Sequence, residues 1–565
     1  MGSRPWYKEM AVYQIWPRSF CDGNGDGIGD LWGVLSKLDY IKSLNVDAIW
    51  FSPLYPSPNA DFGYDISDYK DIHPDYGDLE VFKQVLDEAH KRGLRVFMDL
   101  VVNHTSDQHR WFIESKKGKD NPYHDYYYWR PGRRDSRGRR LPPNNWTSLF
   151  EGGAWEYDEG LDEYYLHLFA KKQPDLNMDN PRVRQEVKDI MRFWLDMGVD
   201  GFREDVITFI SKTPDLPDSY PKLPVANGMK HFSNLPKVHD YLMEFKRDVL
   251  DHYDCFTVGE SPLTTPEVAL RYVAEGPEKV LDEMIAFSHM EADCFMTDMI
   301  QRPFSLLKLK KAMSEWQLKL EGKAWNALYI ENHDHPRVIS RYGSERYHKE
   351  SGKMLAAMYI LQRGTPFVYQ GQEIGMLNIR LPSLGMYQDV ATHNNAAIAS
   401  KLMPKRQVLK LIQKSSRENS RTPMQWSGEK NAGFSDHVPW FYVNENYRKI
   451  NVQAQEEDED SILNFYRRLL KFRKEHPIVL YGDYRDLMPR DKQLYVYERR
   501  YRDQRLLVIC SFTAEQLRFE APEGYDLTRG TNVLSNYDMN FIIANGFTTR
   551  PYELRVYLFE GEARQ

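Results

Sequence analysis

Three acidic residues stand at the ends of short stretches that resemble buried strands. They are Asp205, Glu260 and Asp334. Because the carboxyl ends of parallel strands meet at one end of a barrel, we expect these three side chains to lie together. Hydrolysis of a glycosidic bond requires two carboxyl groups of different pKa, one ionised at the anomeric carbon and one protonated at the leaving oxygen. The three residues therefore predict carboxylate chemistry on a sugar.

The stretch Gly201–Val206 reads as a strand that ends in a charged cluster. Side chains alternate across a strand, so Arg203 and Asp205 share one face and Glu204 lies on the other. A nearby guanidinium keeps a carboxylate ionised, which suits Asp205 to the role of nucleophile. Glu260 has no cation beside it in the sequence, which suits it to the role of general acid. An isolated Arg-x-Asp is more often a structural ion pair, so the assignment depends on the groups around it.

Two histidines strengthen the case for one site. His104 and His333 also follow strand-like runs, and either could donate a hydrogen bond to a sugar hydroxyl. Each polar residue of this set is more often structural when it occurs alone. Their shared position at the ends of successive strands predicts a single functional site.

The elements that must position these side chains alternate between strand and helix. Helical patterns occur at 31–41, 79–91 and 180–197, the last beginning with Asn180-Pro181 and ending before Gly198. Apolar runs predict strands at 11–17, 47–52, 95–102, 201–206, 255–258, 325–330 and 366–369. This alternation predicts a parallel (β/α)8 barrel.

Two segments interrupt the alternation. Residues 105–176 are rich in Tyr, Trp, Gly, Pro and charge, and they predict a small domain inserted after the third strand. Residues 487–565 contain alternating apolar runs, which predict a C-terminal antiparallel β domain. The barrel then comprises residues 1–104 and 177–486.

Composition limits the partners and the compartment. The net charge of −7 over 565 residues gives no electrostatic reason to expect nucleic acid. The basic run at 130–140 is local and is interpreted as a solvated loop. The sequence has no long apolar run for a membrane and no signal peptide, and its four cysteines show neither CxxC spacing nor disulfide density. We therefore expect a cytoplasmic protein, either a monomer or a weak homo-oligomer.

Four short motifs resemble, in order, the signature regions of the α-amylase family of glycoside hydrolases. A fifth stretch, Gln173–Asn177, is similar to the form typical of the oligo-1,6-glucosidase subgroup, as are residues 371–376 and 421–426. The four motifs are DLVVNH (99–104), GFREDV (201–206), VGES (258–261) and ENHD (331–334). The resemblance covers nearly the whole chain and implies the same barrel, insert and C-terminal β domain.

The resemblance also implies roles for individual residues. Asp205 would be the nucleophile, Glu260 the acid/base and Asp334 the carboxylate that holds sugar hydroxyls in the transition state. An Asp61–Arg421 pair would close a pocket for one sugar. Phe62 stands where the subgroup usually has a polar residue. The implied substrate-binding residues are Asp61, Tyr64, His104, Phe150, Arg203, Val206, His333 and Arg421.

The loop at 22–30 is a candidate structural cation site. Oxygen side chains at alternate positions, with glycines between them, suit a hard cation such as Ca²⁺. The loop is not an EF-hand, because its twelfth position is Gly33 rather than glutamate, and a simple Gly/Asp turn is the alternative. The resemblance implies calcium and no organic cofactor, with the ligands Asp22, Asn24, Asp26, the Ile28 carbonyl and Asp30.

Taken together, these features predict an exo-acting retaining α-glucosidase that releases glucose from short α-1,6-linked oligosaccharides. An α-1,4-glucosidase, a trehalose-6-phosphate hydrolase or a sucrose isomerase would share the mechanism. In the subgroup, valine at the position of Val206 accompanies α-1,6 specificity, and the sucrose isomerases usually carry threonine there. A non-catalytic binding protein of the same fold is a remote alternative, because such proteins have lost the carboxylates that this chain keeps.

Overall fold

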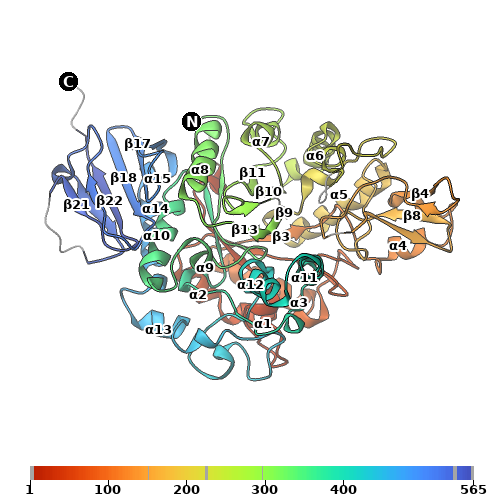
Figure 1. The fold of residues 1–565 in the computed structure, drawn as a ribbon, viewed down its shortest axis with the longest axis horizontal. Coiled ribbons are helices and arrows are strands. Elements are labelled where there is room, and N and C mark those ends of the chain that lie inside the picture. Colours follow the sequence, from red (N-terminus) through yellow and green to blue (C-terminus); the bar gives the residue numbers. More distant parts are fainter. Residues whose placement is uncertain (1–4, 151, 223–226, 296, 539–543, 562–565) are drawn as a thin grey trace.

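The computed structural model describes residues 5–150, 152–222, 227–295, 297–538 and 544–561. An eight-stranded parallel sheet in the order β11-β10-β9-β3-β2-β1-β15-β14 curves into a nearly closed barrel, with β11 beside β14 (Figure 1). The barrel strands are β1 (Val12–Ile15), β2 (Ala48–Phe51), β3 (Arg95–Leu100), β9 (Gly201–Glu204), β10 (Phe256–Ser261), β11 (Glu283–Ala286), β14 (Ala327–Leu328) and β15 (Thr365–Tyr369). The predicted barrel is confirmed.

The sequence analysis missed one barrel strand, β11. This strand is only four residues long and begins with Glu283, a residue type that is rare in buried strands. In the structure Glu283 is fully buried, and its carboxyl accepts a hydrogen bond from the Thr365 hydroxyl on β15. The partner that makes this burial tolerable is distant in the sequence, so the local pattern did not reveal it.

The helices around the barrel follow from local capping signals. The helix α3 (Leu79–Lys91) is capped by Asp78, and α5 (Pro181–Met197) is capped by Asn180 and ended by Gly198 in the left-handed conformation. The pattern at 31–41 forms two short helices, α1 (Leu31–Ser36) and α2 (Leu38–Ser43), rather than one. The other large barrel helices are α6 (Pro236–Asp248), α7 (Pro266–Val273), α8 (Leu306–Leu320) and α10 (His348–Ile360).

The insert between β3 and α5 projects from one side of the barrel, at the right of Figure 1. Its centre is a three-stranded antiparallel sheet in the order β4-β8-β7, preceded by α4 (Arg110–Ser115). These strands are β4 (Trp129–Arg130), β7 (Trp155–Asp158) and β8 (Glu163–Leu166). The basic run forms an exposed hairpin of β5 (Arg133–Arg134) and β6 (Arg140–Leu141), so it is more regular than the predicted loop.

The C-terminal region forms an antiparallel sheet at the opposite end of the molecule (Figure 1). Its strands are β16 (Asp483–Asp486), β17 (Leu494–Tyr501), β18 (Gln504–Ser511), β22 (Leu554–Phe559) and β20 (Thr531–Ser535), in that spatial order. The strand β16 belongs to this sheet although it precedes residue 487. Within the described ranges, none of the helices combines the length and apolar character that crossing a membrane requires.

Candidate active site

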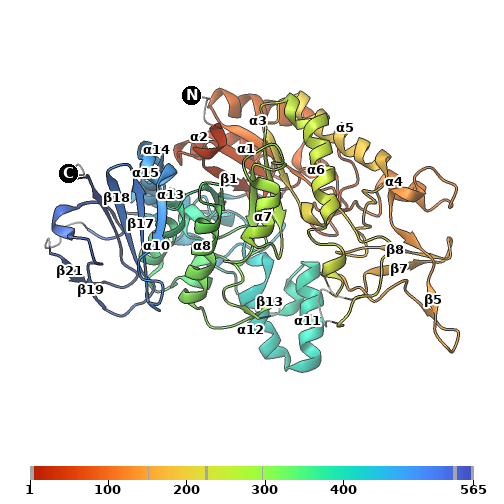
Figure 2. The same cartoon turned by 90° about the horizontal axis from the view of Figure 1, so that it is seen from above.

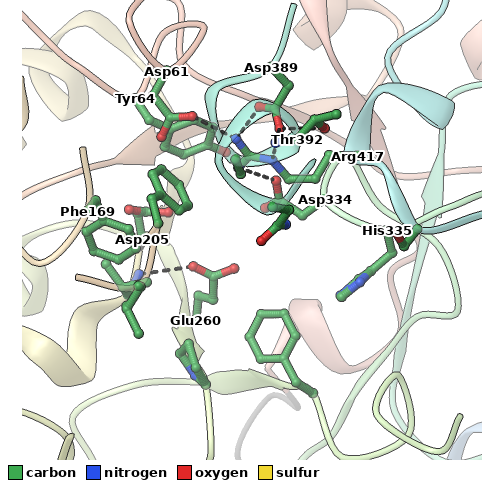
Figure 3. A pocket seen from close by; sticks show the side chains of 18 of the residues that line it. Asp61, Tyr64, Phe169, Asp205, Glu260, Asp334, His335, Asp389, Thr392 and Arg417 are labelled. Carbon is green, nitrogen blue, oxygen red and sulfur yellow. Dashed lines mark hydrogen bonds and ion pairs between the residues drawn. The ribbon is translucent and has the colours of Figure 1, made fainter. Parts of the chain in front are cut away.

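The carboxyl ends of the barrel strands surround a cavity of about 410 Å³. This volume lies within the range of small-molecule sites. Figure 3 shows carboxylates converging on the cavity from different elements. Arg203, His333 and Arg421 lie fully buried behind the lining. The other predicted catalytic and substrate-binding residues line the cavity: Asp61, Tyr64, His104, Phe150, Asp205, Val206, Glu260 and Asp334.

Arg203 contacts three carboxylates at once. Its Nη1 lies 2.6 Å from Oδ1 of Asp205 and 2.8 Å from Oδ1 of Asp99, and its Nη2 lies 2.6 Å from Oε1 of Glu260. Glu260 has no cation beside it in the sequence, but the fold brings Arg203 against it. The β9–β10 register explains the contact, because Val258 pairs with Arg203 and Glu260 lies two residues further along the same face of β10.

These carboxyls have altered acidities. Burial raises the pKa of Asp205, the charges of Glu260 and Asp99 act in the same direction, and Arg203 opposes them. Burial likewise raises the pKa of Asp99 to about 6. From the sequence, only the lowering of the Asp205 pKa by Arg203 was expected, whereas burial raises that pKa. One guanidinium among three carboxyls favours retention of a proton by the group as a whole.

Val206 adds a backbone contact to Glu260. Its φ of 35° and ψ of 39° place it in the left-handed region, which is rare for a β-branched residue. In this conformation its N–H donates to Oε2 of Glu260 at 3.2 Å. Its side chain lines the cavity, as predicted from its position after Asp205.

Asp334 is held by arginines and by a histidine. Nη2 of Arg421 lies 2.8 Å from its Oδ1, and Nε2 of His333 lies 3.0 Å from its Oδ2. Burial opposes ionisation of Asp334, but His333, Arg417 and Arg421 outweigh it and hold its pKa well below the usual range. The hydroxyl of Tyr64 is 2.7 Å from the same His333 nitrogen. Asp334 is therefore an ionised acceptor at the cavity surface.

Asp61 pairs with Arg417, which corrects the predicted Asp61–Arg421 pair. Nη2 of Arg417 lies 2.9 Å from Oδ1 of Asp61, and its Nη1 lies 3.2 Å from Oδ1 of Asp334. Burial raises the pKa of Asp61 to about 6, against the effect of the two arginines. Nε2 of Gln173 donates to Asp61 at 3.1 Å and lies 3.2 Å from Nε2 of His104. Arg417 was not among the predicted substrate-binding residues, and only the fold shows that it meets Asp61.

Aromatic rings form part of the cavity wall. The Phe150 ring lies 5.4 Å from that of Phe169, a lining residue that the sequence analysis missed, and both flank the cavity. Burial lowers the pKa of His104 to about 4, so this imidazole is neutral near pH 7. Phe62 does not belong to the lining and instead packs against Trp440 at 5.4 Å. Phe62, the unusual residue, is therefore not itself part of the cavity wall.

The comparison with known families decides the assignment. A model of the alpha-amylase catalytic domain matches residues 14–482. The chain belongs to the alpha-amylase family. This membership makes the protein a glycoside hydrolase and confirms the resemblance drawn from the motifs.

Relatives of this family member carry several related activities in their names. The oligo-1,6-glucosidase of Parageobacillus thermoglucosidasius is 48% identical over 98% of this chain and 99% of its own length. The trehalose-6-phosphate hydrolase of Bacillus subtilis is 42% identical over 98% of each chain. The crystal structure of the isomaltulose synthase from Erwinia rhapontici NX5 has a TM-score of 0.94 and 38% identity, and covers 99% of this chain and 100% of that one.

The 22–30 loop of this alpha-amylase family chain is closed by its own hydrogen bonds. The carboxylate of Asp22 accepts the N–H groups of Gly25 and Gly27, and Asp26 accepts that of Ile28. Asp30 is fully buried and accepts the N–H groups of residues 23, 24 and 33. In the described part of the chain, no three His, Cys, Asp or Glu side chains converge as metal ligands. These side-chain oxygens are chemically suitable calcium ligands. In this arrangement, however, they already accept hydrogen bonds from backbone N–H groups.

Proposed function

We propose that the protein is an exo-acting retaining α-glucosidase that releases glucose from the non-reducing end of short α-1,6-linked gluco-oligosaccharides of the isomaltose type. The family supplies the reaction class. The names of the relatives most similar to this chain support the linkage.

The observation that carries the proposal is the contact of one guanidinium with both Asp205 and Glu260. Such a contact brings the two carboxyls close together, as in retaining enzymes, where they lie about 5–5.5 Å apart. Asp205 would attack the anomeric carbon while Glu260 protonates the leaving oxygen, so one C–O bond forms as the other breaks. Glu260 would then take a proton from water, and that water would attack the same carbon and release Asp205.

The Asp61–Arg417 pair supports exo action. It joins the segment after β2 to the segment that follows α12 (Lys405–Ser415), so two distant parts of the chain meet at the cavity wall. A cavity closed in this way would accept one terminal sugar and block the chain beyond it. Asp61 and Asp334 would then accept hydrogen bonds from the hydroxyls of that sugar.

The cavity disfavours a phosphorylated substrate. Among the described lining residues, Arg417 is the only arginine or lysine. Arg417 already pairs with Asp61, Asp334 and Asp389, so little of its charge remains for a phosphate. Another carboxylate, that of Glu291, also belongs to the lining. We therefore rank trehalose-6-phosphate hydrolysis below isomaltose hydrolysis.

The deciding experiment compares glucose release from isomaltose, maltose, sucrose, trehalose 6-phosphate and panose. We expect the highest kcat/KM on isomaltose. Preference for trehalose 6-phosphate or maltose, or formation of a sucrose isomer, would replace the α-1,6 assignment by the corresponding alternative. Loss of all activity on these substrates would contradict the proposal as a whole.

We propose three further properties. The 22–30 loop binds one Ca²⁺ through Asp22, Asn24, Asp26, the Ile28 carbonyl and Asp30, a proposal that rests on donor chemistry. The protein is cytoplasmic, which its four free cysteines support. It is a monomer or a weak homo-oligomer, which sedimentation equilibrium over a range of concentrations would test.

A further inference from the structure

Two helices that border the cavity form a separate unit. They are α11 (Val390–Leu402) and α12, and in Figure 2 they project together from the body of the molecule. Their shared apolar contacts form a cluster of their own, distinct from the barrel core: Ile379, Leu381, Tyr387, Ala396, Ala399, Val408, Ile412 and Phe441. Three residues of α11 line the cavity, namely Ala391, Thr392 and Asn395. The position of this helix pair therefore affects the cavity entrance.

Asp389 connects the start of α11 to the sugar pocket. Its side chain is fully buried, and Oδ2 caps the helix by accepting the Thr392 N–H at 2.9 Å and the Thr392 hydroxyl at 3.1 Å. The other oxygen, Oδ1, contacts Nη2 of Arg417. Because a guanidinium is planar, a carboxylate on one edge fixes the direction of the remaining donors. The start of α11 thus sets how Arg417 meets Asp61 and Asp334, as Figure 3 shows.

A second contact joins α11 to the inserted domain. Nδ2 of Asn394 donates to the backbone carbonyl of Phe150 at 2.7 Å. The ring of the same Phe150 lies 5.0 Å from the Arg417 guanidinium. These contacts therefore form a closed circuit that runs from α11 through the pocket to the inserted domain and back. Its members are Asp389, Arg417, Phe150 and Asn394.

We propose that this circuit sets the width of the cavity entrance and thereby the length of oligosaccharide that the enzyme accepts. Asn394 is a specificity-determining residue, because it ties α11 to the inserted domain. Asp389 is a positioning residue, because it acts on the sugar through Arg417. The inference rests on the proposed α-glucosidase function and names the contacts that set its preference for short chains.

The first test weakens the tie at Asn394. Asn394→Ala removes the donor, and Asn394→Asp keeps the shape but places an acceptor against the Phe150 carbonyl. His393→Ala is the matched control, because His393 is the exposed preceding residue of the same helix. We expect the ratio of kcat/KM on dextran to that on isomaltose to rise roughly 3- to 10-fold in both Asn394 variants, the range for one net hydrogen bond. The ratio should stay constant in the control.

The second test removes the charge at Asp389 but keeps the helix cap. Asparagine is also a good N-cap, so Asp389→Asn should keep the cap, while loss of the charge beside buried Arg417 should lower the melting temperature. We expect KM for isomaltose to rise roughly 10-fold or more, the effect of losing one charge-assisted hydrogen bond, while kcat changes much less. A purely structural role would lower the melting temperature without this separation of KM from kcat.

Several outcomes would overturn the inference. An unchanged dextran-to-isomaltose ratio in the Asn394 variants would do so, as would an equal rise in the His393 control. Unchanged KM in Asp389→Asn would remove the positioning role. If the unmodified protein releases no glucose from isomaltose, the proposed function itself has failed, whereas activity on isomaltose with unaltered ratios rejects only the role of the circuit.

Discussion

Nη2 of Arg203 lies 2.6 Å from Oε1 of Glu260, while Nη1 of the same side chain lies 2.6 Å from Oδ1 of Asp205. One cation thus serves both carboxyls of the proposed catalytic pair. When Asp205 forms the glycosyl ester it loses its negative charge, and the guanidinium then has Glu260 and Asp99 as its remaining partners. In the proposed mechanism the guanidinium would then lie beside Glu260 during the second step, where Glu260 would act as the base.

The first prediction concerns the nucleophile. Asp205→Asn keeps the size of the side chain but removes the oxygen anion that attacks the anomeric carbon, so we expect activity to fall by several orders of magnitude. Because Arg203 keeps Asp99 and Glu260 as carboxyl partners in this variant, the melting temperature should change little. A crystal structure should place the Asp205 and Glu260 carboxyls about 5–5.5 Å apart. Near-normal activity in the variant, or a separation near 9 Å, would contradict the assignment.

The second prediction concerns the pair that closes the pocket. Arg417→Ala removes a cation from buried Asp61, whose pKa is already raised to about 6 by burial. Loss of one member of a buried pair costs about 3–5 kcal/mol of stability. Because Arg417 also orients Asp61 and Asp334, we expect kcat/KM on isomaltose to fall as well, by roughly 10²-fold. Arg417→Lys is the matched control for charge without the planar fork. Inhibition by glucose should weaken in the alanine variant, and unaltered glucose affinity would show that the pair does not bind the sugar.

The third prediction concerns linkage preference. Val206→Thr preserves β-branching at the left-handed position, so the backbone N–H should still reach Glu260. The apolar side chain of Val206 can pack the extra methylene of an α-1,6 bond, which is worth ~1–3 kcal/mol, or roughly 10- to 200-fold in rate. We expect kcat/KM on isomaltose to exceed that on maltose, and the threonine variant to narrow the difference by raising maltose turnover. An unchanged ratio would mean that linkage is recognised elsewhere.

The fourth prediction concerns Glu204, a fully buried residue on the face of β9 away from Arg203. Neither of its carboxyl oxygens has a hydrogen-bond partner among the described residues. Burial, with a smaller contribution from Asp282, raises its pKa from 4.5 to about 8. The folded state therefore holds this proton more tightly than the unfolded state, and stability falls as pH rises from about 4.5 to 8.

Replacement by methionine tests that effect. We expect Glu204→Met to stabilise the protein at pH 9 by several kcal/mol more than at pH 5, because about 1.4 kcal/mol accompanies each pKa unit. Chemical denaturation at both pH values measures the difference, and kcat on isomaltose should stay near that of the unmodified protein. An equal gain at both pH values would show that Glu204 does not titrate in this range.

The fifth prediction concerns the proposed cation. Added Ca²⁺ should raise the melting temperature, and chelation should lower it more than it lowers the rate at moderate temperature. Asp26→Asn, at an exposed ligand position, should weaken the response to calcium. If metal analysis finds no bound cation and calcium leaves the melting curve unchanged, the loop is a turn held by its backbone hydrogen bonds.

Strand ends in the sequence located the three carboxylates and two histidines of the candidate site, and the family resemblance supplied the other residues. Strand ends are a local property, and the barrel brings the ends of all its strands to one side. The positions of His104, Asp205 and Glu260 along the chain therefore suffice to predict that they share one site. Glu283 and the strand that it begins were missed because the Thr365 hydroxyl that makes its burial tolerable comes from a distant strand.

The partners within the site were decided by the tertiary structure. From the sequence, Arg203 was expected to form an ion pair with Asp205. The β9–β10 register brings Glu260 against the same guanidinium, which no spacing along the chain could indicate. The family resemblance implied Arg421 as the partner of Asp61, but it is Arg417 that pairs with Asp61 in the structure. The physical reason is that a residue's type and its position on a strand depend on neighbours along the chain, whereas ion pairing and burial depend on atoms brought within a few ångströms by folding.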